Sequence, residues 1–230
     1  MAVSASAKSS PSGNLKVTRA DWIALALSVL VAEGVESVRI LSLSERLNVS
    51  RSSFYWYFES HGDLLDQLLT HWRETNTRAI IERARREAPT ITRGVLNVFE
   101  CWADETVFSP RLDFAIREWA RRSDKVRGEI ETADRDRLEA IRDLYLRHGY
   151  AAVDAFIRAR VLYYMQIGYY VLDVKEPLAT KLGYVSDYIR SFTGVEPSEA
   201  ERADFHAFAW AAEARHAKQG RKRAKAIERT

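Results

Sequence analysis

The stretch over residues 42–65, SLSERLNVSRSSFYWYFESHGDLL, constrains the fold more than any other part of the chain. Leu43 and Leu47 lie four residues apart, which places them on one face of a short helix. Asn48 tolerates the left-handed backbone conformation that a tight turn often needs. Ser50 is a favourable N-cap, so a second short helix is expected to begin directly after it.

The second helix, expected over 51–58, should bury one side and expose the other. Phe54 and Phe58 are four residues apart and share the side that packs against the first helix. The residues left to face outward carry a guanidinium group and several hydroxyls: Arg51, Ser52, Ser53, Tyr55 and Tyr57. A polar helix face after a tight turn is typical of a helix-turn-helix unit, whose second helix enters the major groove of DNA.

The residue types of this stretch follow a longer pattern. In order, it reads Leu43-Ser44, Asn48-Val49-Ser50, Arg51-Ser52-Ser53, Phe54-Tyr55-Trp56-Tyr57-Phe58, Glu59-Ser60-His61 and Asp63-Leu64-Leu65. It resembles the DNA-binding segment of the TetR family of bacterial transcription regulators. That segment usually has a hydrophobic-Ala pair, a Gly-Val-Ser turn, a small-residue triplet, Leu-Tyr-x-His/Tyr-Phe, Pro-Ser-Lys and acidic-Leu-Leu. Three positions differ: Ser44 replaces Ala, Asn48 replaces Gly, and His61 replaces the Lys that commonly contacts a phosphate.

The resemblance implies a ligand-responsive transcription regulator, a repressor by family analogy, which binds a palindromic double-stranded DNA operator as a homodimer and is released by a small-molecule effector. Two copies of the 51–58 helix would enter successive major grooves. Arg51 would pair with guanine, the serines would reach base edges or phosphates, and the tyrosines would donate to phosphates. The expected DNA contacts are Ser50, Arg51, Ser52, Ser53, Tyr55, Tyr57 and His61.

Helical periodicity continues through the rest of the chain, without an alternating strand pattern. A first helix is expected from Thr18, which forms a capping box with Asp21, to Gly34. A long helix should begin at a capping box over 60–63 and end before Pro89. Further helices are expected over 91–105, 110–121, 124–148, 152–173, 177–193 and 198–218, with Ser109 and Ser198 as caps and Gly149, Gly194 and Gly220 at helix ends. The sequence therefore predicts an all-α fold, with an N-terminal three-helix helix-turn-helix domain and a larger helical domain for ligand binding and dimerisation.

Four segments are expected along the chain: a disordered arm over 1–17, the DNA-binding domain over 18–62, the ligand-binding and dimerisation domain over 63–213, and a basic tail over 214–230. The arm is rich in Ser and Ala and has no hydrophobic period. It is either a solvated tail or, through Lys8, Lys16 and Arg19, a contact to the DNA backbone or minor groove.

The formal net charge of +3 is unevenly distributed. The tail carries seven Lys or Arg residues and one Glu, so the rest of the chain is net negative. The basic isoelectric point is therefore weak support for DNA binding by the body of the protein. Three interpretations of the tail stay open: a solubilising segment, an added non-specific DNA contact, or a partner site.

Composition fits a globular protein of the cytoplasm. A chain of 230 residues is long enough for one large or two small domains. Its longest apolar run, over 22–32, would span about 16 Å as a helix, too short for the roughly 30 Å of a bilayer core. No secretory signal is visible before Leu15. The single cysteine, Cys101, excludes an intramolecular disulfide and fits a reducing compartment.

Aromatic residues gather in the expected second domain and could line an apolar pocket with a few polar groups. Gln166 lies one turn from two of them and is a plausible polar contact. The candidate effector-binding residues are Trp102, Phe108, Phe114, Trp119, Tyr145, Tyr163, Gln166 and Tyr170. Taken singly, each is more often an ordinary core residue than a ligand contact, but as a set they favour a cavity, because the resemblance places an effector site between these helices.

Two apolar stripes are candidates for the dimer interface, which the resemblance places on the last two main helices. Gly168 would permit a close approach of helices. The candidate interface residues are Val161, Tyr164, Gly168 and Val171 on one helix and Leu182, Val185 and Ile189 on the next. An internal core is the alternative for both stripes.

Enzyme chemistry finds little support in the sequence. The five histidines and Cys101 show no metal-ligand or triad spacing, and no glycine-rich phosphate loop occurs, so neither a metal nor a cofactor is expected. The charged run over 121–143 is interpreted as a solvated helix face with local ion pairs. A helical enzyme or a protein-interaction module with a helix-turn-helix-like segment is the competing hypothesis; turnover of a small molecule without DNA binding would favour it.

Overall fold

The computed structural model describes the backbone of residues 17–227 and the side chains of residues 17–218. Over this range the chain is all-α, as the sequence predicts, and contains no β-strand. None of the described helices combines the length and the apolarity that crossing a bilayer requires. The arm predicted over 1–17 lies outside the described residues except for Val17.

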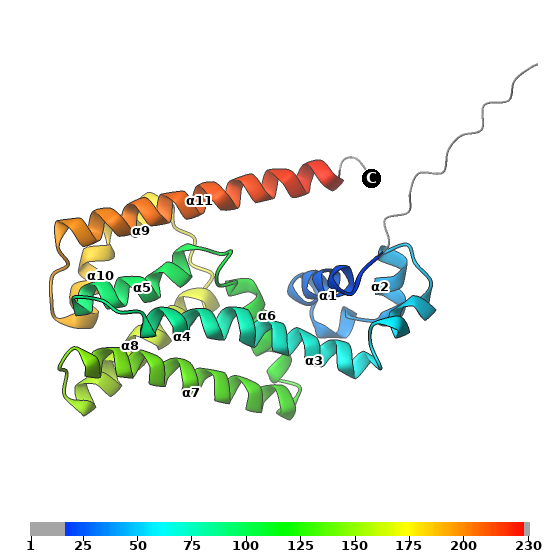
Figure 1. Cartoon of the computed structure of the whole chain (residues 1–230), viewed down its shortest axis with the longest axis horizontal. Helices are drawn as coiled ribbons and strands as arrows, with labels where there is room; N and C mark the ends of the chain where they lie inside the picture. The colour runs from blue at the N-terminus through cyan, green and yellow to red at the C-terminus, as the bar shows by residue number, and fades with distance from the viewer. Residues whose placement is uncertain (1–16, 228–230) are drawn as a thin grey trace, which may run out of the picture.

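The helices divide into a small N-terminal group and a larger bundle. Figure 1 shows α1 and α2 at one end of the molecule, the rod of α3 and α4 leading away from them, and α11 crossing the bundle along its edge. The elements are α1 Arg19–Glu33, η1 Val35–Ser37, α2 Ile40–Arg46, η2 Arg51–Trp56, α3 His61–Trp72, η3 Arg73–Thr77, α4 Arg78–Arg85, α5 Ile91–Ala103, α6 Pro110–Ala120, α7 Asp124–Arg147, α8 Ala152–Val171, α9 Leu178–Gly183, α10 Val185–Thr193 and α11 Glu199–Ile227.

Local capping fixes several helix ends where the sequence predicts them. The Thr18 N–H donates to Asp21 Oδ2 (2.7 Å) and the Asp21 N–H donates to Thr18 Oγ1 (3.3 Å), which completes the predicted capping box of α1. Gly34 ends α1 with φ 84°, a conformation that costs glycine little. The Ser198–Glu201 capping box forms at the start of α11. These short-range signals determine where the chain turns.

Two hydrophobic cores hold the molecule together. The N-terminal core joins α1, α2, η2 and α3 to α6 and the first half of α7, and it contains Trp22, Ala26, Val29, Leu30, Val38, Leu43, Phe54, Phe58, Leu64, Leu68, Leu69, Trp72, Leu112, Ile116, Ala120, Val126, Ile130 and Ala133. The bundle core lies among α4, α5, α7, α8, α9, α10 and α11. Because α6 and α7 contribute to the N-terminal core, the N-terminal group of helices is packed directly on the second part of the chain, with α1 and α3 both contacting α6.

The connecting helix is interrupted, which the sequence did not predict. The expected single helix up to Pro89 is divided into α3 and α4 by a π-helical turn, η3, and it ends at Arg85. A π-turn inserts extra backbone into an α-helix and is frequent at functional sites. Here it brings the side chains of Asn76 and Thr77 to bury against α6 and α7, where both form hydrogen bonds.

Two other expected helices differ from the structure. The helix predicted over 177–193 is two helices, α9 and α10, which meet at Tyr184. Gly220 does not end the last helix, because α11 continues to Ile227. An isolated glycine inside a helix costs about 1 kcal/mol, which the neighbouring helix formers can offset.

Candidate nucleic-acid interface and effector pocket

The segment expected to read DNA is shorter and tighter than the predicted helix. It is the 3₁₀ segment η2, Arg51–Trp56, rather than an α-helix over 51–58. Ser50 has the extended backbone of an N-cap, but its side chain makes no capping hydrogen bond; its Oγ lies 2.8 Å from Ser52 Oγ instead. The Ser53 hydroxyl donates to the Ser50 carbonyl (2.7 Å), a local bond that competes with regular helix formation.

The turn before η2 has the predicted conformation. Asn48 has φ 53°, in the left-handed region that Asn tolerates better than most residues. The Val49 N–H then donates to the Ser44 carbonyl (3.0 Å) and closes the turn. Ser44 is buried, and its hydroxyl donates to the Leu41 carbonyl (2.8 Å), so serine is accommodated here without an unpaired polar atom.

Two aromatic rings anchor η2 underneath, as predicted. Phe54 is fully buried and Phe58 is nearly so, with stacked rings whose centroids are 5.0 Å apart. The Trp22 ring of α1 meets Phe54 edge-on at 5.4 Å. These contacts fix η2 against α1 and leave its other side to solvent.

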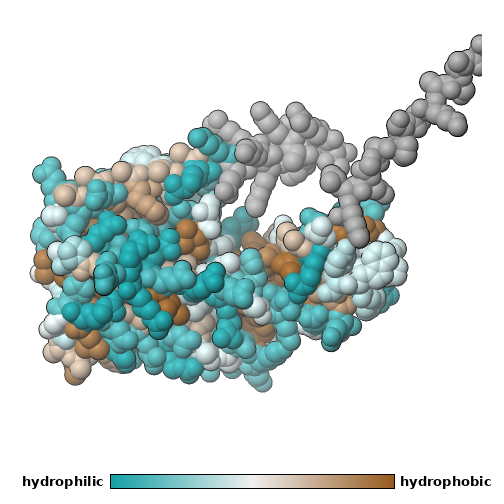
Figure 2. Space-filling model, in the orientation of Figure 1, coloured by the Kyte–Doolittle hydropathy of each residue, from teal (hydrophilic) through white to brown (hydrophobic). Residues whose placement is uncertain are grey.

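The exposed side of η2 contains four of the seven predicted DNA contacts: Ser50, Arg51, Ser52 and Tyr55. Trp56, which the sequence analysis did not single out, is 73% exposed; its position two residues from each buried phenylalanine was the available signal. Figure 2 shows pale and hydrophilic residues side by side at this end of the molecule. This polar and aromatic surface can contact a duplex through phosphates and base edges.

Three predicted contacts are directed into the protein. Ser53 is buried and bonded to Ser50, so it does not face outward as expected. The hydroxyl of half-buried Tyr57 donates to the Val17 carbonyl (2.7 Å), and His61 Nε2 donates to the Val38 carbonyl (2.6 Å). Both side chains therefore have a structural partner in place of a phosphate.

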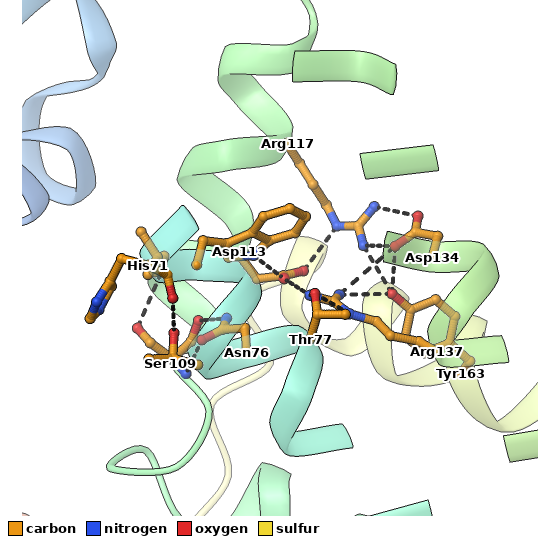
Figure 3. Close-up of polar contacts among 12 residues, drawn as sticks. His71, Asn76, Thr77, Ser109, Asp113, Arg117, Asp134, Arg137 and Tyr163 are labelled. Atoms are coloured by element: carbon orange, nitrogen blue, oxygen red, sulfur yellow. Dashed lines mark hydrogen bonds and ion pairs between the residues drawn. The ribbon is translucent and has the colours of Figure 1, made fainter. Parts of the chain in front are cut away.

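A buried ionic network joins the N-terminal core to the bundle (Figure 3). At its centre is Asp113 of α6, whose Oδ1 accepts from Trp72 Nε1 (2.8 Å) and from Arg137 (3.0 Å), while Oδ2 accepts from Arg117 Nε (3.0 Å). Burial alone would raise the pKa of Asp113, but the charges of Arg137 and Arg117 outweigh burial and hold that pKa below its ordinary value. Trp72 is thus bonded to an ionised carboxylate.

The network extends from α6 to η3, α7 and α8. Arg137 donates to Thr77 Oγ1 (2.8 Å) and to the Tyr163 hydroxyl (2.9 Å). Burial raises the pKa of Tyr163, which therefore keeps its proton and donates to Asp134 (2.6 Å). The prediction that the run over 121–143 is a solvated face is thus wrong for Arg137, which is fully buried. The signal missed was helical spacing, because Ala133, Ala140 and Ile141 lie three or four residues from Arg137 and are buried on α7.

Asn76 makes a second tie between the connecting helix and α6. Its Nδ2 donates to the Ser109 carbonyl (2.8 Å), and its Oδ1 accepts from the Ser109 N–H (3.1 Å). Ser109 is also the N-cap of α6, because its Oγ accepts from the Leu112 N–H. A displacement of α6 would therefore strain these hydrogen bonds and shift η3 and the adjoining helix α3.

A pocket of about 290 Å³ lies among α5, α8, α9, α10 and α11. Three predicted effector-binding residues line it: Trp102, Gln166 and Tyr170. Its remaining lining residues are mostly aromatic and aliphatic, with Glu105, Glu176, Lys181, Glu213 and His216 among them. Phe108 stands behind the pocket and stacks on Tyr170 with ring centroids 6.0 Å apart. This apolar cavity with a few polar groups is suited to a small molecule.

Four other predicted effector contacts lie away from this pocket. Phe114 is 44% exposed on α6, and Trp119 packs against the N-terminal core. Tyr145 is buried in the bundle core, where its hydroxyl donates to the Phe192 carbonyl (3.3 Å). Tyr163 belongs to the ionic network. Aromatic residue type alone did not separate pocket walls from core and surface.

The two stripes proposed for the dimer interface differ in exposure. On α8, Val161, Tyr164 and Val171 are each about half-exposed. On α9 and α10, Leu182, Val185 and Ile189 are buried in the bundle core, so these three do not form a surface for a second chain. Their periodicity reflected packing within the protomer.

Comparison with known proteins adds the last observation. Residues 23–68 match the family model described as bacterial regulatory proteins, tetR family. The match runs from α1 into α3 and covers the Asn48 turn, η2 and both phenylalanine anchors. No curated protein matches the chain. Together with the all-helical fold, the match supports a TetR-type helix-turn-helix DNA-binding domain at the N-terminus of this chain.

Proposed function

We propose that the protein is a dimeric repressor of the cytoplasm, whose affinity for a palindromic operator falls when a small molecule occupies the pocket. The observation that supports this most is a continuous series of contacts from the pocket to the N-terminal core, which holds η2. Tyr170 stacks on Phe108, the Arg137 guanidinium lies 5.9 Å from the Phe108 ring centroid, and it lies 5.1 Å from the Trp72 ring centroid. Trp72 in turn belongs to the N-terminal core.

Tyr170 is the element on which a ligand would act first. Burial raises its pKa well above the ordinary value, and the neighbouring Gln166 acts in the opposite direction. Gln166 lowers this pKa as a neighbouring hydrogen-bonding group, but no described residue makes a hydrogen bond of ordinary geometry to the Tyr170 hydroxyl. An unpaired buried hydroxyl costs roughly 1–3 kcal/mol, so a ring position that provided a partner would be favoured. A ligand that moves this ring also moves Phe108 behind it.

The magnitude required for regulation is modest. A coupling free energy of about 1–3 kcal/mol changes operator affinity roughly 5- to 150-fold. A shift of Arg137 that lengthens its bonds to Asp113 and Thr77 would involve energies of this order, because hydrogen bonds to charged groups contribute about 1.5–3 kcal/mol each.

The DNA contact is tested first by selecting genomic fragments with the purified protein and measuring affinity by fluorescence anisotropy. Arg51→Ala should weaken operator binding by about 1–3 kcal/mol and relax preference at one base step, because guanine pairing is lost. Tyr55→Phe should weaken binding to all sequences similarly, since a phosphate contact carries no sequence information. Arg190→Ala, an exposed arginine of α10, is the control that leaves affinity unchanged. If Arg51→Ala binds like this control, η2 is not the reading element.

The dimer is tested with a charge on the exposed face of α8. A Cβ at Gly168 would meet no atom within 4 Å outside the backbone of its own helix, so Gly168→Glu is expected to leave the fold of the protomer intact. Gly128 of α7 has equally open surroundings, and Gly128→Glu is the matched control. Light scattering should find monomers for Gly168→Glu and dimers for Gly128→Glu. A dimer that persists in Gly168→Glu would exclude this face.

A further inference from the structure

The chemistry of the pocket walls indicates the class of molecule that fits. We infer that the pocket binds an organic cation with an aromatic or aliphatic body. This inference rests on the proposed function only in taking the pocket as the effector site. The chemistry of the lining residues, from which the ligand class is argued, does not depend on DNA binding.

The charges around the pocket favour a positive ligand. Three carboxylates line it, from Glu105, Glu176 and Glu213, against one ammonium, from Lys181. His216 Nε2 lies 3.2 Å from a carboxylate oxygen of Glu105, and Glu176 accepts a hydrogen bond from the Tyr169 hydroxyl. A site with an excess of carboxylates attracts cations and repels anions.

The aromatic rings supply a second attraction for a cation. Trp102, Tyr169, Tyr170 and Tyr188 line the pocket together with Phe99 and Phe205. The Lys181 ammonium already lies 5.6 Å from the centroid of the Tyr169 ring, so a positive charge is accommodated against an aromatic face at this site. Clusters of aromatic rings recognise quaternary ammonium groups through the negative potential of the ring faces.

The apolar walls determine the rest of the ligand. Met165, Leu178, Leu182 and Val185 line the pocket between the aromatic residues. An inorganic or strongly hydrated cation would lose its water against these walls without replacement. A phenyl or alkyl body gains from the same burial. The expected ligand therefore has a weakly hydrated positive centre attached to an apolar group.

The first experiment compares two probes of the same shape and different charge. Phenyltrimethylammonium and its uncharged isostere tert-butylbenzene are titrated into the full-length protein by calorimetry. The cation should bind roughly 2- to 30-fold more tightly, the range that corresponds to one cation–aromatic interaction. Equal affinity, tighter binding of the hydrocarbon, or no binding of the cation would each overturn the inference.

Variants assign the preference to the pocket. Lys181→Met removes the competing ammonium. It should increase the affinity for the cation and leave the affinity for the hydrocarbon nearly unchanged. Glu213→Gln should weaken the cation by up to about 5-fold, as for an exposed ion pair. Glu82→Gln, on the exposed surface of α4, is the control and should change neither probe. If Lys181→Met weakens the cation, or Glu82→Gln matches Glu213→Gln, the binding site lies elsewhere.

Operator binding is measured separately, so that the two proposals can fail independently. If the cation binds and the operator affinity stays constant, the pocket chemistry holds and the effector role of this pocket is wrong. If another molecule releases the operator and the cation does not bind, the regulatory proposal holds and the ligand class is wrong.

Discussion

Asp113→Asn is the sharpest test of how the N-terminal core is joined to the bundle. The carboxylate is 2% exposed and accepts hydrogen bonds from Trp72, Arg137 and Arg117 at 2.8, 3.0 and 3.0 Å. Asparagine keeps the shape and one acceptor oxygen, but it removes the negative charge. It also turns an amide NH₂ toward one of the two guanidinium groups. Arg137, with no exposed surface, would keep its charge after losing its closest counter-ion.

The expected loss of stability is about 3 kcal/mol. Removing one partner of a buried ion pair typically costs about 3–5 kcal/mol, because the other charge stays buried without compensation. The lower end applies here because Asp134 still neutralises Arg117 at 2.6 Å and lies 3.8 Å from Arg137. Against a total unfolding free energy of about 5–15 kcal/mol, this is a large fraction.

Urea unfolding followed by tryptophan fluorescence measures the effect, at one fixed protein concentration because the stability of any oligomer depends on concentration. Asp187→Asn is the matched control, since its pair with Arg190 is more than half exposed on both sides. That control should lose less than about 1 kcal/mol. If Asp113→Asn loses no more than Asp187→Asn, the network does not hold the two cores together.

The same carboxylate predicts a pH dependence. Its folded pKa lies below the ordinary 3.8, so its contribution to stability is fully present above that value. The contribution is lost as pH falls below about 4 through the folded pKa. The unfolding free energy of the wild type should therefore decrease in this window more steeply than that of Asp113→Asn. Parallel curves would contradict an ionised Asp113.

Three further predictions concern single positions. Asn48→Ala should lower the unfolding free energy by about 1–2 kcal/mol in thermal unfolding, because φ 53° is unfavourable for alanine. Asn48→Gly should lower it less, and equal losses for the two variants would show that the turn changes its backbone conformation. Cys101 is buried and its pKa is raised to about 12, so a disulfide reagent should label it only as the protein unfolds; rapid labelling of the native protein would contradict this. Gly94→Ala places a Cβ 2.6 Å from Leu144 Cδ1 and should cost about 1–3 kcal/mol in urea unfolding, whereas Gly168→Ala, with open space, should not.

The sequence predicted features that depend on neighbours a few residues apart. The capping box of α1, the left-handed Asn48 and the Phe54–Phe58 face all follow from local spacing. The outward face of η2 was only partly predictable. The Ser53 hydroxyl donates to a backbone carbonyl three residues earlier, and the Tyr57 hydroxyl donates to a backbone carbonyl 40 residues earlier. Neither hydrogen bond can be predicted from the residue types or from the hydrophobic periodicity of the sequence.

Features that depend on long-range packing could not be predicted. The stripes on α8 and α10 have the same hydrophobic period, yet Val161 is 52% exposed and Ile189 is fully buried. Periodicity shows that a face needs a partner, and it does not show whether that partner is the same chain. The π-turn η3 could likewise not be predicted from the sequence, because it depends on the hydrogen bonds that Asn76 and Thr77 form with α6 and α7 in the folded protein.

A charged junction is a costly way to join two cores, and its free energy depends more strongly on geometry than that of an apolar contact. Hydrophobic side chains of similar volume are often as stabilising as a buried ion pair or more so, but they tolerate small shifts. Hydrogen bonds weaken steeply with angle and distance, so a displaced helix changes this junction between discrete arrangements. The combined Asp113→Leu and Arg137→Met variant should therefore fold with near wild-type stability in urea and still bind operator DNA. Its operator affinity should no longer respond to the effector that releases the wild type. A double variant that still responds fully would show that the signal reaches η2 without passing through Asp113 and Arg137.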